Sequence, residues 1–489
     1  MKRLRLLFAL LLAAGGLTAA AFTAGTASAD SGCAATYSVT SDWGTGFQAA
    51  LTVTAGSAAV TGWTVSFAFS GDQTLTEGWD GTWSQSGATV TVTNASYNGS
   101  LAAGASTSAG ALFSYSGTNT APASVTCTGT PAVTTSPSPS PTTTSTPSGP
   151  APQLHVSGNE LVDANGNQVV LHGVDRSGTE YECVQGNGIF DGPNDQASIT
   201  AIKSWGPVNA VRVPLNEACW NGESYVDSAY AGANYQAAIE AYVNLLNANG
   251  IVAILDLHWT DGLYTGDSSA CSSAEAVCQK PMPDAAEAIP FWTSVANAFM
   301  GNDAVIFDLF NEPYASRATG STSTGWECWE EGGTCPGISY QVAGMQEMIN
   351  AVRSTGATNV IMLGGEEYAN DLTDWLQYEP TDPDNNLVAS WHSYNFNTCN
   401  TQSCWTSEVA PVIAAVPVVA GEIGENDCAG DYIDPLTAWL ESENTSFLAW
   451  TWDDWANDCS SGPTLITDYS GTPTTYGAAY EAILSALGG

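Results

Sequence analysis

Short apolar runs recur along the last two thirds of the chain, and each leads into a polar residue. Residues 304–307 lead to Asn311 and Glu312, and residues 416–421 lead to Glu422. An apolar run of this length between turn residues predicts a buried strand. The expected strands end near Asp175, Pro214, His258, Glu312, Glu366, Tyr394, Glu422 and Trp452.

Helical patterns lie between these strands. Residues 235–249 and 340–354 repeat apolar positions at intervals of three and four, and the second stretch includes Val342. Gly250 and Gly356 follow these stretches, as expected of residues that end helices. A short hairpin, 154–156 with 160–162, precedes the first strand. Eight strand–helix units predict an α/β fold, a (β/α)8 TIM barrel over residues 154–489, with its active site at the carboxyl ends of the strands.

Residues 30–130 follow a different pattern. Segments 48–54, 63–69 and 89–93 alternate with a period of two between turns that contain Gly and Asn. Short strands at regular spacing predict an all-β sandwich domain. Cys33 and Cys127 bracket this block, and one bridge between them would tie its two ends together.

Two further segments have no pattern from which a core could form. Residues 1–29 begin with Lys2, Arg3 and Arg5, continue with an apolar run and end in small residues, which predicts a secretory signal peptide. Residues 131–153 consist almost entirely of Pro, Thr and Ser, which predicts an extended linker. We therefore expect a secreted, extracellular protein with two folded domains.

The charge of the chain restricts its partners. Nine basic and 49 acidic residues give a net charge of −40, which becomes about −43 without the signal peptide. Such a charge repels nucleic acids and anionic membranes and favours a neutral substrate. Twelve cysteines in an exported chain predict disulfides rather than a metal site. Their spacing suggests the further pairs Cys271/Cys278, Cys328/Cys335, Cys399/Cys404, Cys428/Cys459 and Cys183/Cys219.

The sandwich block resembles a family 2 carbohydrate-binding module over nearly all its length. The resemblance rests on its paired terminal cysteines and on Trp43-Gly44-Thr45-Gly46-Phe47, Gly62-Trp63-Thr64 and Asn94-Ala95-Ser96-Tyr97-Asn98-Gly99. It implies that Trp43, Trp79 and Tyr97 lie in a line and stack on the glucose rings of cellulose. A flat ring suits the apolar face of a sugar. Trp63 lies within an alternating strand and is expected in the core, whereas Trp83 is left unassigned.

The predicted strand ends of the barrel carry polar and aromatic residues in a definite order. They are Arg212, His258, Asn311, Glu312, His392, Tyr394, Glu422 and a tryptophan, Trp450 or Trp452. Two glutamates at strand ends suggest acid and base chemistry on a glycosidic bond. The ordered set resembles glycoside hydrolase family 5, the cellulase family of clan A, over the entire barrel block. The resemblance implies hydrolysis with retention, with Glu312 as general acid/base and Glu422 as nucleophile.

The resemblance also implies supporting roles. Arg212 and Tyr394 are expected to hydrogen-bond Glu422, and Asn311 to bind the 2-hydroxyl of the sugar. Substrate hydroxyls and the acid/base would be held by His258 and His392.

The sequence leaves two candidates for the tryptophan that forms the floor of the site. The order of the family favours Trp450, but alternation along a strand places Trp452 on the same side. Further polar groups at strand ends could shape subsites or play no part, namely Asp175, Arg176, Glu366 and Glu367.

The expected activity is that of an endo-β-1,4-glucanase, a cellulase that acts as a monomer on polysaccharide without a cofactor or metal. One alternative is a family 5 enzyme for mannan, xyloglucan or furanoside side chains. Loops such as 183–187 and 326–329 could block one end of the cleft and cause exo action. A second alternative is a non-catalytic polysaccharide-binding protein.

Overall fold

The computed structural model describes residues 32–56, 60–95, 98, 99, 101, 105–131, 150–266, 272–455, 459 and 462–488. The chain divides into two compact units, residues 1–141 and 142–489. The predicted signal peptide and residues 132–149 of the predicted linker lie outside the described residues. None of the helices in the described ranges has both the length and the apolar character needed to cross a bilayer.

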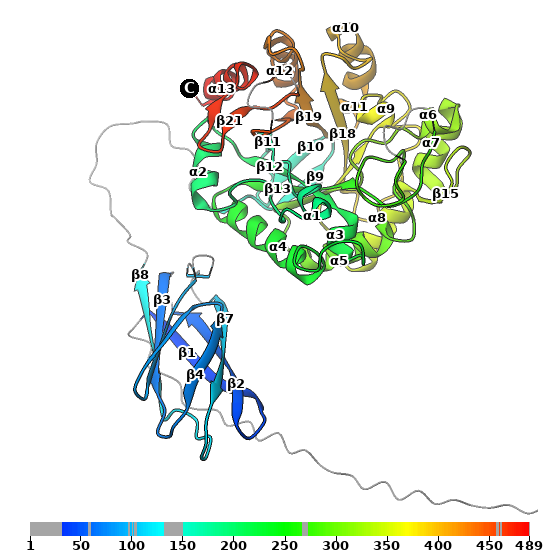
Figure 1. Ribbon diagram of the computed structural model, residues 1–489. Coiled ribbons are helices and arrows are strands. Elements are labelled where there is room, and N and C mark those ends of the chain that lie inside the picture. Colours follow the sequence, from blue (N-terminus) through cyan, green and yellow to red (C-terminus); the bar gives the residue numbers. More distant parts are fainter. Residues whose placement is uncertain are drawn as a thin grey trace, which may run out of the picture. The chain divides into compact units, whose positions relative to one another are not determined.

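The first unit consists of two four-stranded antiparallel sheets, which confirms the predicted β-sandwich (Figure 1). One sheet has the order β1-β2-β7-β4 and the other β5-β6-β3-β8. The strands are β1 (Cys33–Asp42), β2 (Gly46–Ala55), β3 (Val60–Ala68), β4 (Thr74–Trp79), β5 (Thr82–Ser86), β6 (Thr89–Thr93), β7 (Ser106–Ser114) and β8 (Val125–Pro131). A disulfide joins Cys33 to Cys127, as the spacing suggested.

The period of two in the sequence accounts for the core of this sandwich. In β2, Phe47, Ala49, Leu51 and Val53 are all fully buried, while the positions between them are less buried. Trp63 is 1% exposed, and its indole N–H donates to the carbonyl of residue 98 at 2.7 Å. The expectation that Trp63 belongs to the core is therefore confirmed.

The second unit contains a closed barrel of eight parallel strands surrounded by helices, which confirms the predicted (β/α)8 fold (Figure 1). Around the barrel the strands are β11 (His172–Asp175), β12 (Ala210–Asn216), β13 (Val252–Trp259), β14 (Val305–Asp308), β17 (Ile361–Gly364), β18 (Leu387–Tyr394), β19 (Val418–Gly424) and β20 (Ser446–Ala449). The predicted hairpin consists of β9 (Leu154–Ser157) and β10 (Glu160–Asp163), and its Leu154 and Leu161 share a buried cluster with the inward residues of the barrel.

Helices connect the strands on the outside of the barrel. They are α1 (Glu182–Gln185), α2 (Gln196–Lys203), α3 (Glu217–Asn221), α4 (Ala233–Ala248), α5 (Ala288–Phe299), α6 (Ala315–Thr319), α7 (Thr322–Glu331), α8 (Met345–Ser354), α9 (Glu366–Ala369), α10 (Gln402–Cys404), η1 (Trp405–Val409), α11 (Ala410–Ile413), α12 (Ile433–Ser442) and α13 (Thr475–Leu487). Two small hairpins, β15 (Gly332–Thr334) with β16 (Gln341–Ala343) and β21 (Ile466–Asp468) with β22 (Thr472–Pro473), lie in the loops.

The helix expected over residues 340–354 is shorter in the structure. Its first residues form β16, in which Val342 pairs with β15, and α8 begins only at Met345 after Gly344. The β-branched side chain of Val342 suits a strand, and its burial there explains why it imitated a helical apolar position. Gly250 and Gly356 follow α4 and α8 with left-handed φ values of 79° and 89°, as helix-ending glycines do.

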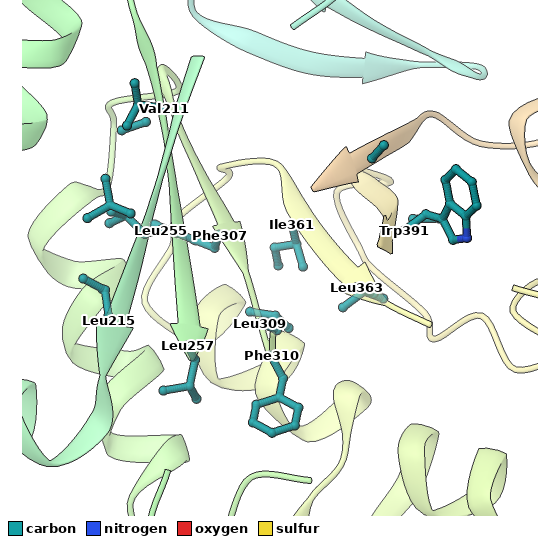
Figure 2. Close-up of a cluster of buried hydrophobic side chains, with 14 of the residues drawn as sticks. Val211, Leu215, Leu255, Leu257, Phe307, Leu309, Phe310, Ile361, Leu363 and Trp391 are labelled. Atoms are coloured by element: carbon teal, nitrogen blue, oxygen red, sulfur yellow. The ribbon is translucent and has the colours of Figure 1, made fainter. Parts of the chain in front are cut away.

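Alternation along the barrel strands decides which residues face the interior. Val211, Leu255 and Phe307 point outward to the helices and lie in one hydrophobic cluster (Figure 2). The next residues of the same strands, Arg212, Asp256 and Asp308, therefore point into the barrel. Asp175 is paired in register with Arg212, and Asp256 with Asp308. Strand register thus gathers four charged side chains near the carboxyl ends of the strands.

Four disulfides fasten the loops of this unit. They join Cys183 to Cys219, Cys328 to Cys335, Cys399 to Cys404 and Cys428 to Cys459. These pairs agree with those suggested by spacing. The remaining suggested pair includes Cys271, which lies outside the described residues.

Candidate active site

Arg212 is the centre of a buried polar network at the carboxyl ends of the strands. Its side chain is fully buried and contacts four carboxylates at 2.8 to 3.1 Å, those of Asp175, Asp256, Asp308 and Glu422. Its second terminal nitrogen also donates to Asn311 Oδ1 at 2.9 Å. A planar guanidinium with five donors can satisfy several acceptors at once, which a lysine could not do with the same geometry.

The surplus of carboxylates in this network shifts their protonation. Burial raises the pKa of Asp256 to about 7 and that of Asp308 to about 7, although Arg212 opposes both shifts. Burial also raises the pKa of Asp175 well above its usual range. Protons on these aspartates reduce the negative charge that Arg212 must balance. Its interaction with Glu422 is then less diluted by competing anions.

Glu422 is held at both of its carboxylate oxygens. Arg212 Nη1 donates to Oε1 at 2.8 Å, and the Tyr394 hydroxyl donates to Oε2 at 2.6 Å. Nδ1 of His392 is 3.6 Å from Oε2. The residue is 3% exposed. Two donors on different oxygens fix the plane of the carboxylate.

Glu312 has a different environment. Its side chain is 17% exposed; Nδ1 of His392 lies 3.1 Å from Oε1, and the Gln279 amide donates to Oε2 at 3.0 Å. Burial raises the pKa of Glu312, and the hydrogen bond from Gln279 partly opposes this. Burial lowers the pKa of His392 to about 3, so this histidine is neutral near pH 7. Glu312 thus lacks the strong cationic partner that Glu422 has.

The two glutamates lie close together. One carboxylate oxygen of Glu312, one of Glu422 and one ring nitrogen of His392 all lie within 4.8 Å of one another. Carboxyl groups about 5 to 5.5 Å apart are typical of glycosidases that act with retention, whereas inversion requires about 6.5 to 9.5 Å. The proximity of the two carboxylates therefore fits attack by one of them on a sugar carbon held between them.

These groups open into a cavity of about 540 Å3, a volume within the usual range for ligand sites. The cavity combines acidic, amide and aromatic side chains, as expected for a site that binds polyols. Its lining residues are His258, Gln279, Asn311, Glu312, Arg317, Glu367, Tyr368, Tyr394, Phe396, Asn397, Thr398, Glu422, Trp450 and Pro463.

One of the two candidate tryptophans lies in the cavity. Trp450 lines it and stacks on the His258 ring, with centroids 5.3 Å apart and planes 11° apart. Nδ1 of His258 is 2.6 Å from Asp256 Oδ2, and burial lowers the pKa of His258 to about 4. Trp452 is 1% exposed and packs against Trp205. The geometry thus places Trp450 where a sugar ring could lie on it.

Of the further polar groups at strand ends, Glu367 lines the cavity and Asp175 belongs to the Arg212 network. Glu366 is buried and accepts from the backbone N–H of Ser316 at 2.9 Å, outside the lining. Arg176 is buried and donates to nearby loop carbonyls.

Sequence reasoning missed several residues of the site. Asp256 and Asp308 were detectable, because each is a charged residue at an inward position of an apolar strand. Gln279 lies in a loop, and Arg317 and Tyr368 lie in α6 and α9, which are too short for hydrophobic periodicity to have predictive power. Nothing in their local sequence indicates that they meet at the cavity.

The sandwich unit has two exposed tryptophans on one sheet. Trp43 is 54% exposed and Trp79 is 37% exposed. A Cβ atom at Gly110 would lie 2.4 Å from the Trp79 indole, and one at Gly46 would lie 2.8 Å from the Trp43 indole. Each ring therefore lies directly against glycine backbone.

The other aromatic candidates of this face differ. Trp83 is partly buried, donates to the Trp79 carbonyl at 3.1 Å and packs against Phe113. Tyr97 lies outside the described residues.

Comparisons with known proteins agree with this division. The profile of the family described as Cellulase (glycosyl hydrolase family 5) matches residues 162–457, which is more than half of the chain. The profile described as Cellulose binding domain matches residues 33–132. These two matches fall on the barrel and on the sandwich, respectively.

Individual relatives cover most of the chain. Endoglucanase CelA of Streptomyces lividans is 28% identical over 505 residues, covering 99% of this chain and 98% of its own. A mannan endo-1,4-beta-mannosidase of Cellvibrio japonicus is 23% identical over 336 residues, covering 66% of this chain and 64% of its own. The crystal structure of a beta-glucanase from Saccharophagus degradans in complex with cellotetraose has a TM-score of 0.52 at 18% identity, covering 72% of this chain and 98% of its own, and shows the shared fold.

Proposed function

Because the chain belongs to glycosyl hydrolase family 5 and carries a cellulose-binding domain, we propose that it is a secreted, monomeric endo-β-1,4-glucanase that cleaves cellulose with retention. Glu422 is the nucleophile and Glu312 the general acid/base. The observation that carries this proposal is the asymmetry of the two glutamates. Arg212 and Tyr394 donate hydrogen bonds to the two carboxylate oxygens of Glu422. Glu312 instead accepts from the Gln279 amide, and burial raises its pKa.

The first step uses both carboxyl groups. A Glu422 oxygen attacks the anomeric carbon and forms an ester bond, while the bond from that carbon to the leaving oxygen breaks. Glu312 gives its proton to the leaving oxygen, so the departing chain leaves as a neutral alcohol. A raised pKa favours the protonated form of Glu312, as a proton donor requires.

The second step reverses these roles. Glu312, now a carboxylate, removes a proton from water, and the water oxygen attacks the anomeric carbon. The ester bond to Glu422 breaks, and the nucleophile returns to its charged form. Two displacements at one carbon restore its original configuration. Arg212 and Tyr394 stabilise the leaving carboxylate in this step.

The neighbouring residues position the sugar. Asn311 lines the cavity and is held by Arg212, so its amide is oriented to bind the 2-hydroxyl. His258 and the neutral His392 bind hydroxyl groups and Glu312. Trp450 offers an aromatic face on which the sugar that is attacked can stack.

The sandwich unit supports cellulose as the substrate. A domain that binds cellulose through Trp43, Trp79 and Tyr97 would hold the enzyme on that polymer. Mannan is the second candidate, because a mannan endo-1,4-beta-mannosidase also matches the chain. Both polymers have β-1,4 linkages, so the same pair of carboxylates could serve either.

The test combines one variant with a panel of substrates. Glu422→Ala should abolish hydrolysis while cellulose pull-down is unchanged, because the variant removes the nucleophile and leaves the sandwich untouched. Carboxymethyl-cellulose, glucomannan, xyloglucan and aryl furanosides would be assayed with product lengths recorded. The matched control is Glu441→Gln, whose carboxylate pairs with His172 outside the cavity lining. Undiminished hydrolysis by Glu422→Ala would refute the nucleophile, and release of monosaccharides alone would refute endo action.

A further inference from the structure

We propose that the Arg317–Glu367 pair binds the sugar on the leaving-group side of the scissile bond, an inference that rests on the proposed function. Arg317 lies in α6, which follows β14, and Glu367 lies in α9, which follows β17. Arg317 Nε donates to Glu367 Oε2 at 2.5 Å, and both side chains line the cavity. The ligand is therefore a neutral sugar with neighbouring hydroxyl groups.

The position of the Arg317–Glu367 pair around the barrel indicates the direction in which the leaving chain extends. In the closed ring of eight strands, β14 stands opposite β20. Trp450, which follows β20, marks the side that holds the attacked sugar. Glu312 follows β14 and must reach the leaving oxygen, so the leaving chain extends from Glu312 toward the loops after β14 and β17. Arg317 and Glu367 are the charged groups that the cavity presents there.

The exposure of Arg317 is unusual for a cation of this protein. Six basic residues follow the signal peptide, and all six lie in described ranges. Arg176, Arg212 and Lys280 are buried, the Arg353 side chain is 6% exposed, and Lys203 donates to a backbone carbonyl at 2.6 Å. The Arg317 side chain is 44% exposed, and its ion pair with Glu367, which is 30% exposed, adds little to stability.

The chemistry of the pair suits a carbohydrate. The remaining guanidinium N–H groups of Arg317 point as a planar fork and can donate to two adjacent hydroxyl oxygens. The free carboxylate lone pairs of Glu367 can accept from the hydroxyl hydrogens. The guanidinium also lies over the Tyr368 ring, 5.0 Å from its centroid, which restricts its orientation.

The backbone at this pair is strained and tied to the catalytic segment. Glu367, Tyr368 and Ala369 have φ values of 56°, 64° and 58°, in the left-handed region that non-glycine residues avoid. The N–H of Tyr368 donates to the Pro313 carbonyl at 2.8 Å, and its ring stacks on Tyr314 with centroids 4.7 Å apart. Strain held by such contacts often marks a functional site. Here it fixes Glu367 relative to the residues directly after Glu312.

The test separates leaving-group binding from catalysis. Arg317→Ala, Glu367→Ala and Arg317→Lys would be assayed on cellopentaose, labelled at its reducing end, and on an aryl β-cellobioside, whose leaving group lacks sugar hydroxyls. We expect kcat/KM on cellopentaose to fall about tenfold more than on the aryl glycoside in both alanine variants. The distribution of cleavage sites should stay the same, because every productive complex of cellopentaose places a sugar directly after the scissile bond. Arg317→Lys should recover only part of the loss, because lysine lacks the planar fork.

Two controls keep the outcomes distinct. Lys203→Gln removes a positive charge outside the cavity lining and should change neither rate nor cleavage site. Equal losses on both substrates would overturn the assignment of this pair. A wild-type protein that cleaves manno-oligosaccharides but not cello-oligosaccharides would refute the glucanase function alone. The same variants would then be assayed on mannopentaose. A wild type that cleaves neither refutes both.

Discussion

Gln279 should set the upper pH limit of activity. Its amide donates to Glu312 Oε2 at 3.0 Å and lowers the pKa of that carboxyl, against the raising effect of burial. Gln279→Leu removes the donor, so the pKa of Glu312 should rise further. Glu312 must be protonated to act as the acid, and its pKa sets the pH above which activity falls. The basic limb of the profile should therefore move to higher pH.

The magnitude follows from the type of hydrogen bond. A bond to a charged group contributes about 1.5 to 3 kcal/mol, and a factor of ten in proton affinity corresponds to about 1.4 kcal/mol, so the basic limb should move by about 1 to 2 pH units. Gln279 is only half-buried, so water replaces part of the interaction and the lower value, about 1 unit, is expected.

The assay is kcat/KM on an aryl β-cellobioside measured from pH 4 to 9. The acidic limb should stay in place, because within the described part of the chain the Gln279 side chain hydrogen-bonds Glu312 and not the groups that hold Glu422. Gln346→Leu, at a glutamine outside the cavity lining, serves as the control. A basic limb that stays in place or moves to lower pH would refute either the hydrogen bond or the role of Glu312 as the acid.

Two other predictions concern binding and stability. Trp43→Ala and Trp79→Ala should each weaken binding to crystalline cellulose about tenfold without changing hydrolysis of a soluble substrate, and equal binding by wild type and both variants in a pull-down would contradict the stacking face. Glu180 is 3% exposed, and burial raises its pKa to about 8, so the native state binds its proton more tightly than the unfolded state does. The protonated Glu180 contributes to stability in full below the unfolded-state pKa near 4.5, and this contribution is lost as pH rises toward 8. The melting temperature should therefore fall over this pH range, and it should fall less in Glu180→Gln. Parallel curves of melting temperature against pH for the two proteins, measured by calorimetry, would contradict this.

Much of the fold could be predicted because hydrophobic periodicity is a local signal. The strand ends at Arg212, His258, Asn311 and Glu422 could be located because each follows a distinct apolar run. The choice between Trp450 and Trp452 could not be made, since β20 ends at Ala449 and strand alternation no longer applies beyond it.

Gln279 and Arg317 could not be predicted from the sequence, for another reason. Gln279 lies in a loop and Arg317 in the short helix α6, 38 residues further along the chain, yet both line one cavity. Their meeting depends on the barrel closing, and no local pattern encodes it. The inward aspartates Asp256 and Asp308 are an intermediate case, since their strands were predicted but their pairing with Arg212 was not.

The glycines beneath the sandwich tryptophans bear on how this face could change. Gly46 and Gly110 determine how closely the two indoles approach the backbone. Whether the rings are coplanar therefore depends on the main chain as well as on the rings. A methyl group at Gly110 would lift the Trp79 indole and tilt it, whereas one at Gly46 would press on the Trp43 indole and also meet the Phe113 carbonyl oxygen. A rigid crystal surface can stack on both rings only when the rings are coplanar, whereas a single flexible glycan chain can adapt to a tilted ring. Substituting the glycines instead of the tryptophans therefore offers a route to shift preference from crystalline to soluble polysaccharide.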